Sequence, residues 1–568
     1  MTVPARARWV HLKGHNPHLV EGAGLTEPDV TRRVAVADAD RRDEATSTQR
    51  LVRSSAVVGL GTALSRVTGL LRTIALAYAL GATAVAEGYN LANTTPNMVY
   101  DLLLGGILSA TLVPVFVDRF DNEDDDGVSA IMSVAAVCLV ALTVAAVIAA
   151  PLIFKLYTWQ KHGTDAAEAS RIGVPLLRFF LPQIFFYGLT ALGTALLNAR
   201  RRFAAPAFAP VLNNLVVIAV LVAFARVAGR SPSVGSVTGS SGQLWLLGLG
   251  TTVGIVVMAV TLGPAVRAAG MRLRWRPRLR DPAVRKVASL SGWTFGYVLA
   301  NQVALVVSLA LAGREPGGVS WYTYAFIFFQ LPYGLFAVSV MTTVTPDLSA
   351  AASAGDQSSF RERFALGGRL MTLVVLPSSI GMVVLARPLV NVLLGRGSFT
   401  AADATGTAQT LAWFAAGLVF FSLYLFALRG FYALHDTKTP FLINLGENAL
   451  NIVLAFALVG RYGVPGLAAA YSVSYLVACV VALGALRHRA GGLGGRALLA
   501  PIARMVAGGV AMGAVIVGVG HTIGGSTGVG GIVRISVSVV LGAAVYFGAA
   551  FVLRIDDVRA GANRLARR

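Results

Sequence analysis

The sequence predicts an all-α integral membrane protein of about fourteen transmembrane helices. We expect two parallel repeats of six helices each, an N-lobe and a C-lobe around a central cavity, followed by two extra C-terminal helices. Hydrophobic residues make up 55% of the 568 residues, and the mean hydropathy is +0.68. Charged residues are 13%, against about 25% in soluble proteins.

Apolar segments long enough to cross a bilayer follow one another along the chain, since about twenty apolar residues suffice for a helix. They lie near 54–80, 88–117, 129–156, 172–198, 204–229, 243–268, 284–312, 319–346, 364–394, 404–430, 438–460, 464–486, 497–521 and 529–553. If the first segment starts on the cytoplasmic side, the even-numbered loops are cytoplasmic and hold about nineteen Lys and Arg residues, whereas the odd-numbered loops hold about ten. The positive-inside rule then places both termini in the cytoplasm.

The same pattern divides the chain into parts. Residues 1–50 mix eight basic with seven acidic residues and have no apolar core, which is typical of a disordered cytoplasmic tail. We expect the N-lobe at 51–268, a basic cytoplasmic linker at 269–283 and the C-lobe at 284–490. Residues 491–568 would hold the last two helices and a basic tail.

A weak internal duplication supports the two lobes. Three landmarks recur at offsets of 232 to 236 residues: 199–206 with Asn214 returns as 433–440 with Asn448, Pro96 as Pro332, and Pro114 as Pro346. Halves of six helices keep the same orientation, so the repeats are parallel and related by an axis along the membrane normal. Two such lobes suit transport by alternating access, with the binding site near the midplane.

Arg66 and Arg72 interrupt the first apolar segment. A mid-bilayer arginine costs roughly 2.5–3.5 kcal/mol, so both side chains should face protein, water or an anion. Their spacing turns them about 120° apart on a helix. One could bind a phosphate while the other pairs with Glu87, which opens the next segment. That segment also contains Asp101, a further candidate for substrate binding. The alternative is an ion pair that only fixes helix packing.

Two further groups are candidates. Arg178 lies in the fourth apolar segment and is a secondary substrate-binding candidate. A polar stripe at i, i+3, i+4 and i+7 crosses the eleventh segment; it consists of Asn444, Glu447, Asn448 and Asn451. This stripe could bind Na⁺ or relay a proton, or its amides could simply bond to neighbouring helices.

Several classes of function are excluded. The formal charge of +21 comes without a nucleic-acid recognition motif, and the arginines cluster in short loops where topology and anionic membrane lipids explain them. The sequence contains no GxxxxGK[ST] motif, so nothing in it indicates direct use of ATP. We expect neither a catalytic residue, a cofactor nor a bound structural metal.

Five stretches resemble the MurJ/MviN family of lipid II flippases, within the superfamily that also holds MATE exporters and polysaccharide flippases. They are SRVTGLLR (65–72), ATAVAEGYNLANTTPNMV (82–99), LLNARRRFAAPAFAPVLNN (196–214), LLGRGSFT (393–400) and RGFYALHDTKTP (429–440). The resemblance implies a two-lobe, fourteen-helix transporter in the bacterial plasma membrane. Its substrate would be the undecaprenyl-diphosphate-linked peptidoglycan precursor, flipped from the inner to the outer leaflet.

By this resemblance Arg66 and Arg72 match the arginines of a cationic cavity, and Glu87 matches an acidic residue early in helix 2. The chain departs from the family in three places. Tyr100 and Asp101 replace a basic pair, Phe326 and Ile327 replace an Asp-Arg pair in helix 8, and Thr73 replaces an acid.

The expected function is therefore a flippase rather than an enzyme, coupled to Na⁺, to H⁺ or to the membrane potential alone. One alternative is a MATE-like drug/cation antiporter or a polysaccharide flippase. The other is a transport-inactive scaffold that recruits cell-wall synthesis or division proteins.

Overall fold

A computed structural model describes residues 57–103, 112–271, 273–278, 292–493, 495–553 and 555. These residues are almost entirely helical and contain no strand, which confirms the predicted all-α fold. The expected tail 1–50, residues 279–283 of the linker and the basic C-terminal tail lie outside the described residues.

The helices follow the expected apolar segments. Those of the N-terminal half are the first helix Val57–Leu80, α2 (Ala84–Asp101), α3 (Val113–Asp121), α4 (Asp125–Ile148), α5 (Ala150–Tyr157), α6 (Gly163–Phe180), α7 (Gln183–Ala199), α8 (Ala204–Ala228), α9 (Val234–Gly239), α10 (Ser241–Val260) and α11 (Leu262–Ala268). Those of the C-terminal half are α13 (Gly292–Ala312), α14 (Gly318–Pro332), the π-helical turn η2 (Tyr333–Ala337), α15 (Val338–Ser353), α16 (Gln357–Leu394), α17 (Ala401–Ala433), α18 (Lys438–Arg489), α19 (Gly495–Thr522) and α20 (Gly528–Val552).

Several of these helices begin at a polar side chain, because the first backbone N–H groups of a helix have no partner within it. The hydroxyl of Thr83 accepts a hydrogen bond from the backbone of Ala86 at the start of α2. Thr400 and Asp403 form a capping box at the start of α17. These caps fix where the chain re-enters a helix after each turn.

Two expected segments are bent rather than straight, and two others are joined in one kinked helix. Segment 172–198 consists of α6 and α7, which meet just before Pro182. In the eighth segment, the π-helical turn follows Pro332, whose missing N–H disturbs the regular helical ladder. In α18, Gly463 has non-helical dihedral angles, φ 59° and ψ −145°, and separates the two expected segments 438–460 and 464–486.

Eleven of the described helices are long and apolar enough to cross a membrane. The bend in α18 falls inside one of them, and α13 contributes a shorter apolar helix, Gly296–Ala312. The protein is thus a multi-pass membrane protein, and the count of fourteen stays a prediction.

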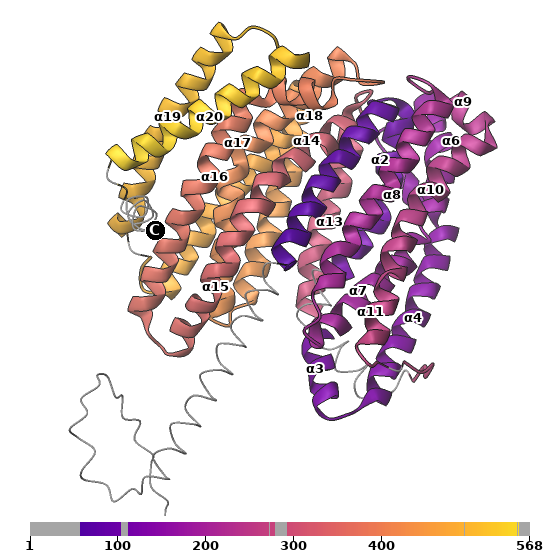
Figure 1. Cartoon of the computed structure of the whole chain (residues 1–568), viewed down its shortest axis with the longest axis horizontal. Coiled ribbons are helices and arrows are strands. Elements are labelled where there is room, and N and C mark those ends of the chain that lie inside the picture. Colours follow the sequence, from indigo (N-terminus) through magenta and orange to yellow (C-terminus); the bar gives the residue numbers. More distant parts are fainter. Residues whose placement is uncertain are drawn as a thin grey trace, which may run out of the picture. The chain divides into compact units, whose positions relative to one another are not determined.

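The helices from Leu60 onward belong to one compact unit. Figure 1 shows α4, α6, α8 and α10 in one bundle and α15 to α18 in another. Helices α19 and α20 pack against each other and against α16, on the side of the second bundle away from the first.

The two halves repeat each other in detail. The turn before α8 and the turn before α18 each hold a non-glycine residue with positive φ, Arg201 at 55° and His435 at 59°, which are separated by the same 234 residues as the sequence landmarks. The side-chain amide of Asn214 donates to the backbone oxygen of Ser65 in the first helix at 3.2 Å. Correspondingly, the amide of Asn448 donates to Asn301 in α13 at 2.8 Å.

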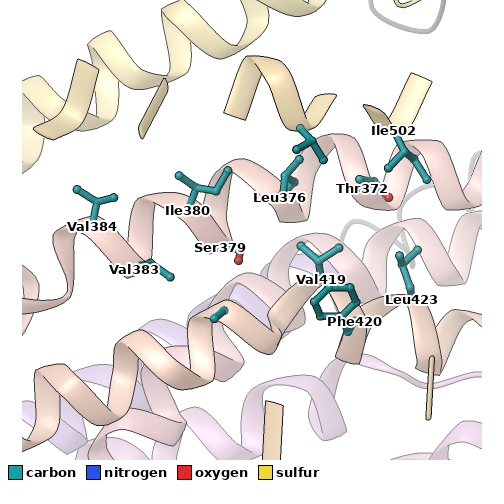
Figure 2. Close-up of a pocket in the computed structure, with 12 residues that line it drawn as sticks. Thr372, Leu376, Ser379, Ile380, Val383, Val384, Val419, Phe420, Leu423 and Ile502 are labelled. Atoms are coloured by element: carbon teal, nitrogen blue, oxygen red, sulfur yellow. The ribbon is translucent and has the colours of Figure 1, made fainter. Parts of the chain in front are cut away.

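Helices α16, α17 and α19 enclose an apolar groove of about 410 Å³ (Figure 2). Leu376 and Ile380 of α16 line it together with Val419 and Phe420 of α17 and Ile502 of α19. No lining side chain is charged, so this groove suits a hydrocarbon chain and not a phosphate.

Candidate functional site

Arg66 reaches from the first helix to the C-terminal half of the chain. Its guanidinium lies over Gly334 in η2, where an added Cβ atom would be 2.9 Å from Nε of Arg66. Since real Cβ contacts are longer than this, the glycine permits the close approach. Arg66 is half-buried, and no hydrogen bond or ion pair to another described residue engages it.

A third arginine, Arg429, joins the site from α17. Arg429 and Arg66 both lie near enough to Tyr333 for their charges to act on its hydroxyl group. Arg429 is exposed and has no ion-pair or hydrogen-bond partner within the described part of the chain. The sequence contained a sign of this residue, because Arg429 is the only charged residue in segment 404–430.

Arg72 lies against tyrosines of the N-terminal half. Its charge acts on the hydroxyl groups of Tyr89 in α2 and Tyr187 in α7. Tyr187 donates a hydrogen bond to Asn97 at 2.7 Å, and its ring stacks on that of Tyr100 with 4.4 Å between ring centroids. Like Arg66, Arg72 is half-buried and forms no ion pair with any described carboxylate.

Asp101 ends α2 and is exposed. Its carboxylate accepts a hydrogen bond from the side chain of Gln302 in α13, so it also connects the two halves. Its charge acts on Tyr187, as does that of Arg72. The site therefore holds three arginines and one carboxylate, and its net charge is positive.

Glu87 has a different partner from the one expected. It is only 4% exposed, and its Oε2 atom lies 3.0 Å from Nζ of Lys161. Its other oxygen accepts a hydrogen bond from the backbone of Val319, in the first turn of α14, at 3.4 Å. The expected ion pair between Glu87 and Arg66 or Arg72 is thus wrong, because a lysine from the α5–α6 loop supplies the positive charge.

More contacts join the two halves near Glu87. The hydroxyl of Tyr324 in α14 donates to the backbone oxygen of Gly81 at 2.8 Å, and the amide of Asn90 donates to Ser320 at 3.1 Å. The backbone N–H of Ser398, in the loop between α16 and α17, donates to the backbone oxygen of Tyr78 at 3.0 Å. The halves are therefore closed against each other at the end of the molecule where the first helix ends.

Arg178 lies in the last turn of α6 and is exposed. Arg178 forms no ion pair or hydrogen bond among the described residues, so no contact joins it to Arg66 or Arg72. Its role in substrate binding stays a prediction.

The polar stripe of the eleventh segment is buried in the C-terminal half. Glu447, Asn448 and Asn451 are 4–5% exposed and Asn444 is 0% exposed. The amides of Asn444 and Asn448 both donate to Oδ1 of Asn301, at 3.0 and 2.8 Å. The amide N–H groups of Asn444 and Asn448 thus bond to a neighbouring helix, as the second interpretation of the stripe predicted.

The side-chain oxygens of the same stripe, unlike its N–H groups, mostly lack hydrogen-bond partners. Oδ1 of Asn444, Oε2 of Glu447 and Oδ1 of Asn451 are buried without a hydrogen-bond partner. The other carboxylate oxygen of Glu447 accepts a hydrogen bond from Ser474 at 3.2 Å. A buried oxygen without a donor is costly, so these oxygens are open to a hydrogen-bond donor or a cation.

Phe326, which stands where the family has a charged pair, packs into aromatic side chains of the C-terminal half. Its ring contacts Tyr322, Phe329, Phe414 and Tyr471 at centroid distances of 5.4 to 6.3 Å. At this position packing between aromatic rings therefore takes the place of a charged side chain.

These features define a class of protein: a multi-pass helical membrane transporter of two similar halves with unpartnered arginines between them. The fold resembles that of an inward-facing MATE family transporter of the MOP superfamily, with a TM-score of 0.62, 15% identity, and coverage of 77% of this chain and 98% of that one. It also resembles a lipid II flippase MurJ in the inward closed conformation, with a TM-score of 0.73, 21% identity, and coverage of 89% and 100%.

The family model described as lipid II flippase MurJ matches residues 76–538, so the chain belongs to the MurJ family. A probable lipid II flippase MurJ of Vibrio cholerae is 29% identical over 442 residues, which are 76% of this chain and 82% of that protein. The lipid II flippase MurJ of Burkholderia cenocepacia is 29% identical over 449 residues, 77% and 84% of the two chains. Arg66 and Arg72 lie just before the residues that the family model matches.

Proposed function

We propose that this protein is a flippase that moves lipid II, the undecaprenyl-diphosphate-linked peptidoglycan precursor, from the inner to the outer leaflet of the bacterial plasma membrane. The observation that carries the proposal is the group of unpartnered arginines, Arg66, Arg72 and Arg429, in a chain of the MurJ family. No covalent bond is made or broken, so the protein acts as a transporter and not as an enzyme.

The arginines supply what a diphosphate requires. A guanidinium group is planar, keeps its charge and donates paired hydrogen bonds to phosphate oxygens. Surroundings of low dielectric constant strengthen this attraction. Asp101 and Gln302 would hydrogen-bond the polar sugar–peptide headgroup, to which Arg178 is a further candidate contact.

Alternating access follows from the contacts between the halves. By the positive-inside rule the first helix ends on the external side, so the closed end that includes Glu87, Tyr324 and Ser398 faces outward. Lipid II would enter from the cytoplasmic side in this state. These contacts must break for the outward-open state to form, and both termini would be cytoplasmic.

The buried oxygens around Glu447 would couple transport to a cation. The Glu447 carboxylate with one neighbouring amide oxygen, that of Asn444 or of Asn451, could coordinate Na⁺, and the carboxylate alone can carry a proton. Binding there would favour one arrangement of the C-lobe over the other, provided that the cation binds the two states unequally. The membrane potential, worth roughly 2.3 kcal/mol per charge per 100 mV, is the other source of energy.

The test is reconstitution of the purified protein in liposomes that contain fluorescent lipid II, with headgroup accessibility measured on each side. We expect translocation of lipid II. A Na⁺ gradient, a proton gradient and a membrane potential are each applied separately, and we expect the one that drives transport to speed translocation. Normally folded protein that leaves lipid II in its original leaflet would overturn the proposal and favour a scaffold. Efflux of cationic dyes without lipid II movement would favour a MATE-like antiporter.

A further inference from the structure

A short non-helical segment after α11, residues 273–278, has no role in the transport proposal. Its sequence is Leu-Arg-Trp-Arg-Pro-Arg. Trp275 is 67% exposed and Leu273 is 42% exposed, and Arg274 and Arg278 are exposed beside them. A tryptophan flanked by arginines is the combination of residues favoured where a protein meets the headgroup region of a membrane.

The segment is held in place by its backbone. The buried hydroxyl of Ser129 in α4 accepts a hydrogen bond from the backbone N–H of Arg274 at 3.1 Å. The buried hydroxyl of Ser133, one turn later, accepts one from the backbone N–H of Arg276 at 2.8 Å. Trp275 lies between these two bonds, so its exposure comes from a fixed backbone and not from a loose end.

These bonds also set the depth of Trp275 relative to the bilayer. Helix α4 begins at Asp125, so Ser129 and Ser133 lie about 6 and 12 Å along its axis. After Ser133 the helix contains no charged residue up to its end at Ile148. The level of Trp275 is therefore where α4 passes from its acidic start into the hydrocarbon region.

The charges around the segment leave two arginines uncompensated. Arg276 pairs with Asp126. Asp124 pairs with Arg119 at 2.6 Å, and a hydrogen bond from the backbone of Gly127, with Arg119 beside it, keeps the pKa of Asp124 below its usual value.

Of the other acidic residues at 118–126, Asp118 and Asp121 belong to α3, Glu123 to the turn before α4 and Asp125 to the start of α4. Arg274 and Arg278 have no ion-pair partner among the described residues.

We propose that residues 273–278 form an interfacial anchor for anionic phospholipids of the cytoplasmic leaflet. Trp275 lies at the boundary between headgroups and acyl chains, where indole rings are favoured. Arg274 and Arg278 bind lipid phosphates, since basic residues next to a membrane attract anionic lipids. The proposal rests on the membrane location of the protein and not on transport of lipid II.

The test uses the full chain in liposomes with brominated acyl chains, which quench tryptophan fluorescence only on contact. The chain has seven tryptophans, so the signal of Trp275 is the difference between wild type and Trp275→Phe. We expect quenching of this difference signal, and stronger quenching when the brominated lipid is phosphatidylglycerol than when it is phosphatidylcholine.

The double variant Arg274→Gln, Arg278→Gln should lose the preference for phosphatidylglycerol, by up to about 25-fold if each arginine contributes about 1 kcal/mol at the surface. The matched control is Arg230→Gln, an exposed arginine in the loop before α9, which should keep it. Equal quenching by both lipids would overturn the proposal. Quenching of Trp275 by aqueous acrylamide but not by brominated lipid would also overturn the proposal, and would point to an acidic partner protein as the occupant of this segment.

Discussion

The N-terminal and C-terminal halves of this protein use the same contact to hold different chemistry. Asn214 ties α8 to the first helix, and Asn448 ties α18 to α13 at the corresponding position. In the N-terminal half the first helix then carries Arg66 and Arg72, which no described carboxylate neutralises. In the C-terminal half, α13 carries Asn301, and its partner helix carries the buried Glu447.

This difference shows how a duplicated scaffold can divide two tasks. Cations that are half-buried and unpartnered attract an anionic substrate. Oxygens that are buried without donors attract a cation. Under the proposed function, the N-lobe would bind the lipid diphosphate, and the C-lobe would bind the ion that drives its movement. Each task can be removed separately.

The strongest test of the division removes the cations of the N-lobe. The double variant Arg66→Ala, Arg72→Ala should lower lipid II translocation in liposomes by about 100-fold or more, because each charge-assisted hydrogen bond contributes about 1.5–3 kcal/mol. Arg230→Ala is the control. A normally folded double variant with wild-type rates would remove the arginines from the site.

The second test removes the acid of the C-lobe. Glu447→Gln should abolish stimulation by the coupling gradient, which can reach about 50-fold for one charge at 100 mV, and leave lipid II binding intact. Glu362→Gln changes an exposed glutamate of α16 and should have no effect. If Glu447→Gln responds to every gradient as the wild type does, coupling lies elsewhere.

Arg429 is the exception to the division, since it brings a cation from the C-lobe. Arg429→Ala should weaken lipid II binding by about 10-fold, less than the double variant, because the side chain is exposed and one charged hydrogen bond is lost. Arg429→Lys should recover part of the affinity. The measurement is the concentration dependence of translocation; an unchanged half-saturating concentration would exclude Arg429 from the site.

A smaller effect is expected at the contact between Arg66 and Gly334. In Gly334→Ala the new methyl group displaces the guanidinium, and an unfavourable rotamer costs about 0.5–1.5 kcal/mol, or about 2- to 10-fold in lipid II affinity. Thermal stability should stay equal or rise, because alanine favours helices. Gly548→Ala in α20, where a Cβ meets nothing within 4 Å, controls for the gain in stability. Unchanged affinity would show that Arg66 acts from another position.

The smallest effects test the shared scaffold itself. Asn214→Ala and Asn448→Ala each remove the hydrogen bonds between corresponding helices and should cost about 0.6–1.7 kcal/mol of stability. Thermal unfolding in detergent measures both. Similar costs would support equivalent roles, whereas a cost for only one of them would contradict the structural repeat.

Much of the fold could be predicted from the sequence because a bilayer leaves few choices. Apolar length specifies the spans, and the recurrence of 199–206 as 433–440 specifies the repeat. Arg66 and Arg72 were found because a charge in a helix without neighbouring charges is expensive. The same reasoning applies to Arg429, the only charged residue of segment 404–430.

Partners could not be predicted in the same way. Lys161 pairs with Glu87 across 74 residues of sequence and comes from a loop, so no periodic pattern connects the two. Asn301 accepts from both Asn444 and Asn448, yet nothing in the sequence around it indicated its partners. Phe326 could be read as a lost charge, but only packing shows that it fills an aromatic core.

The sequence by itself determined that this chain crosses a membrane many times, that its two halves repeat, and that two arginines of the first helix must face protein, water or an anion rather than lipid. These follow from the cost of placing charges and unpaired backbone in hydrocarbon, which acts on each segment separately. The tertiary structure decided that Glu87 binds Lys161, that Arg429 joins Arg66 at Tyr333, and which oxygens of α18 are left without donors. Such pairings depend on which helices meet and at what rotation, and that is settled by packing over the whole molecule.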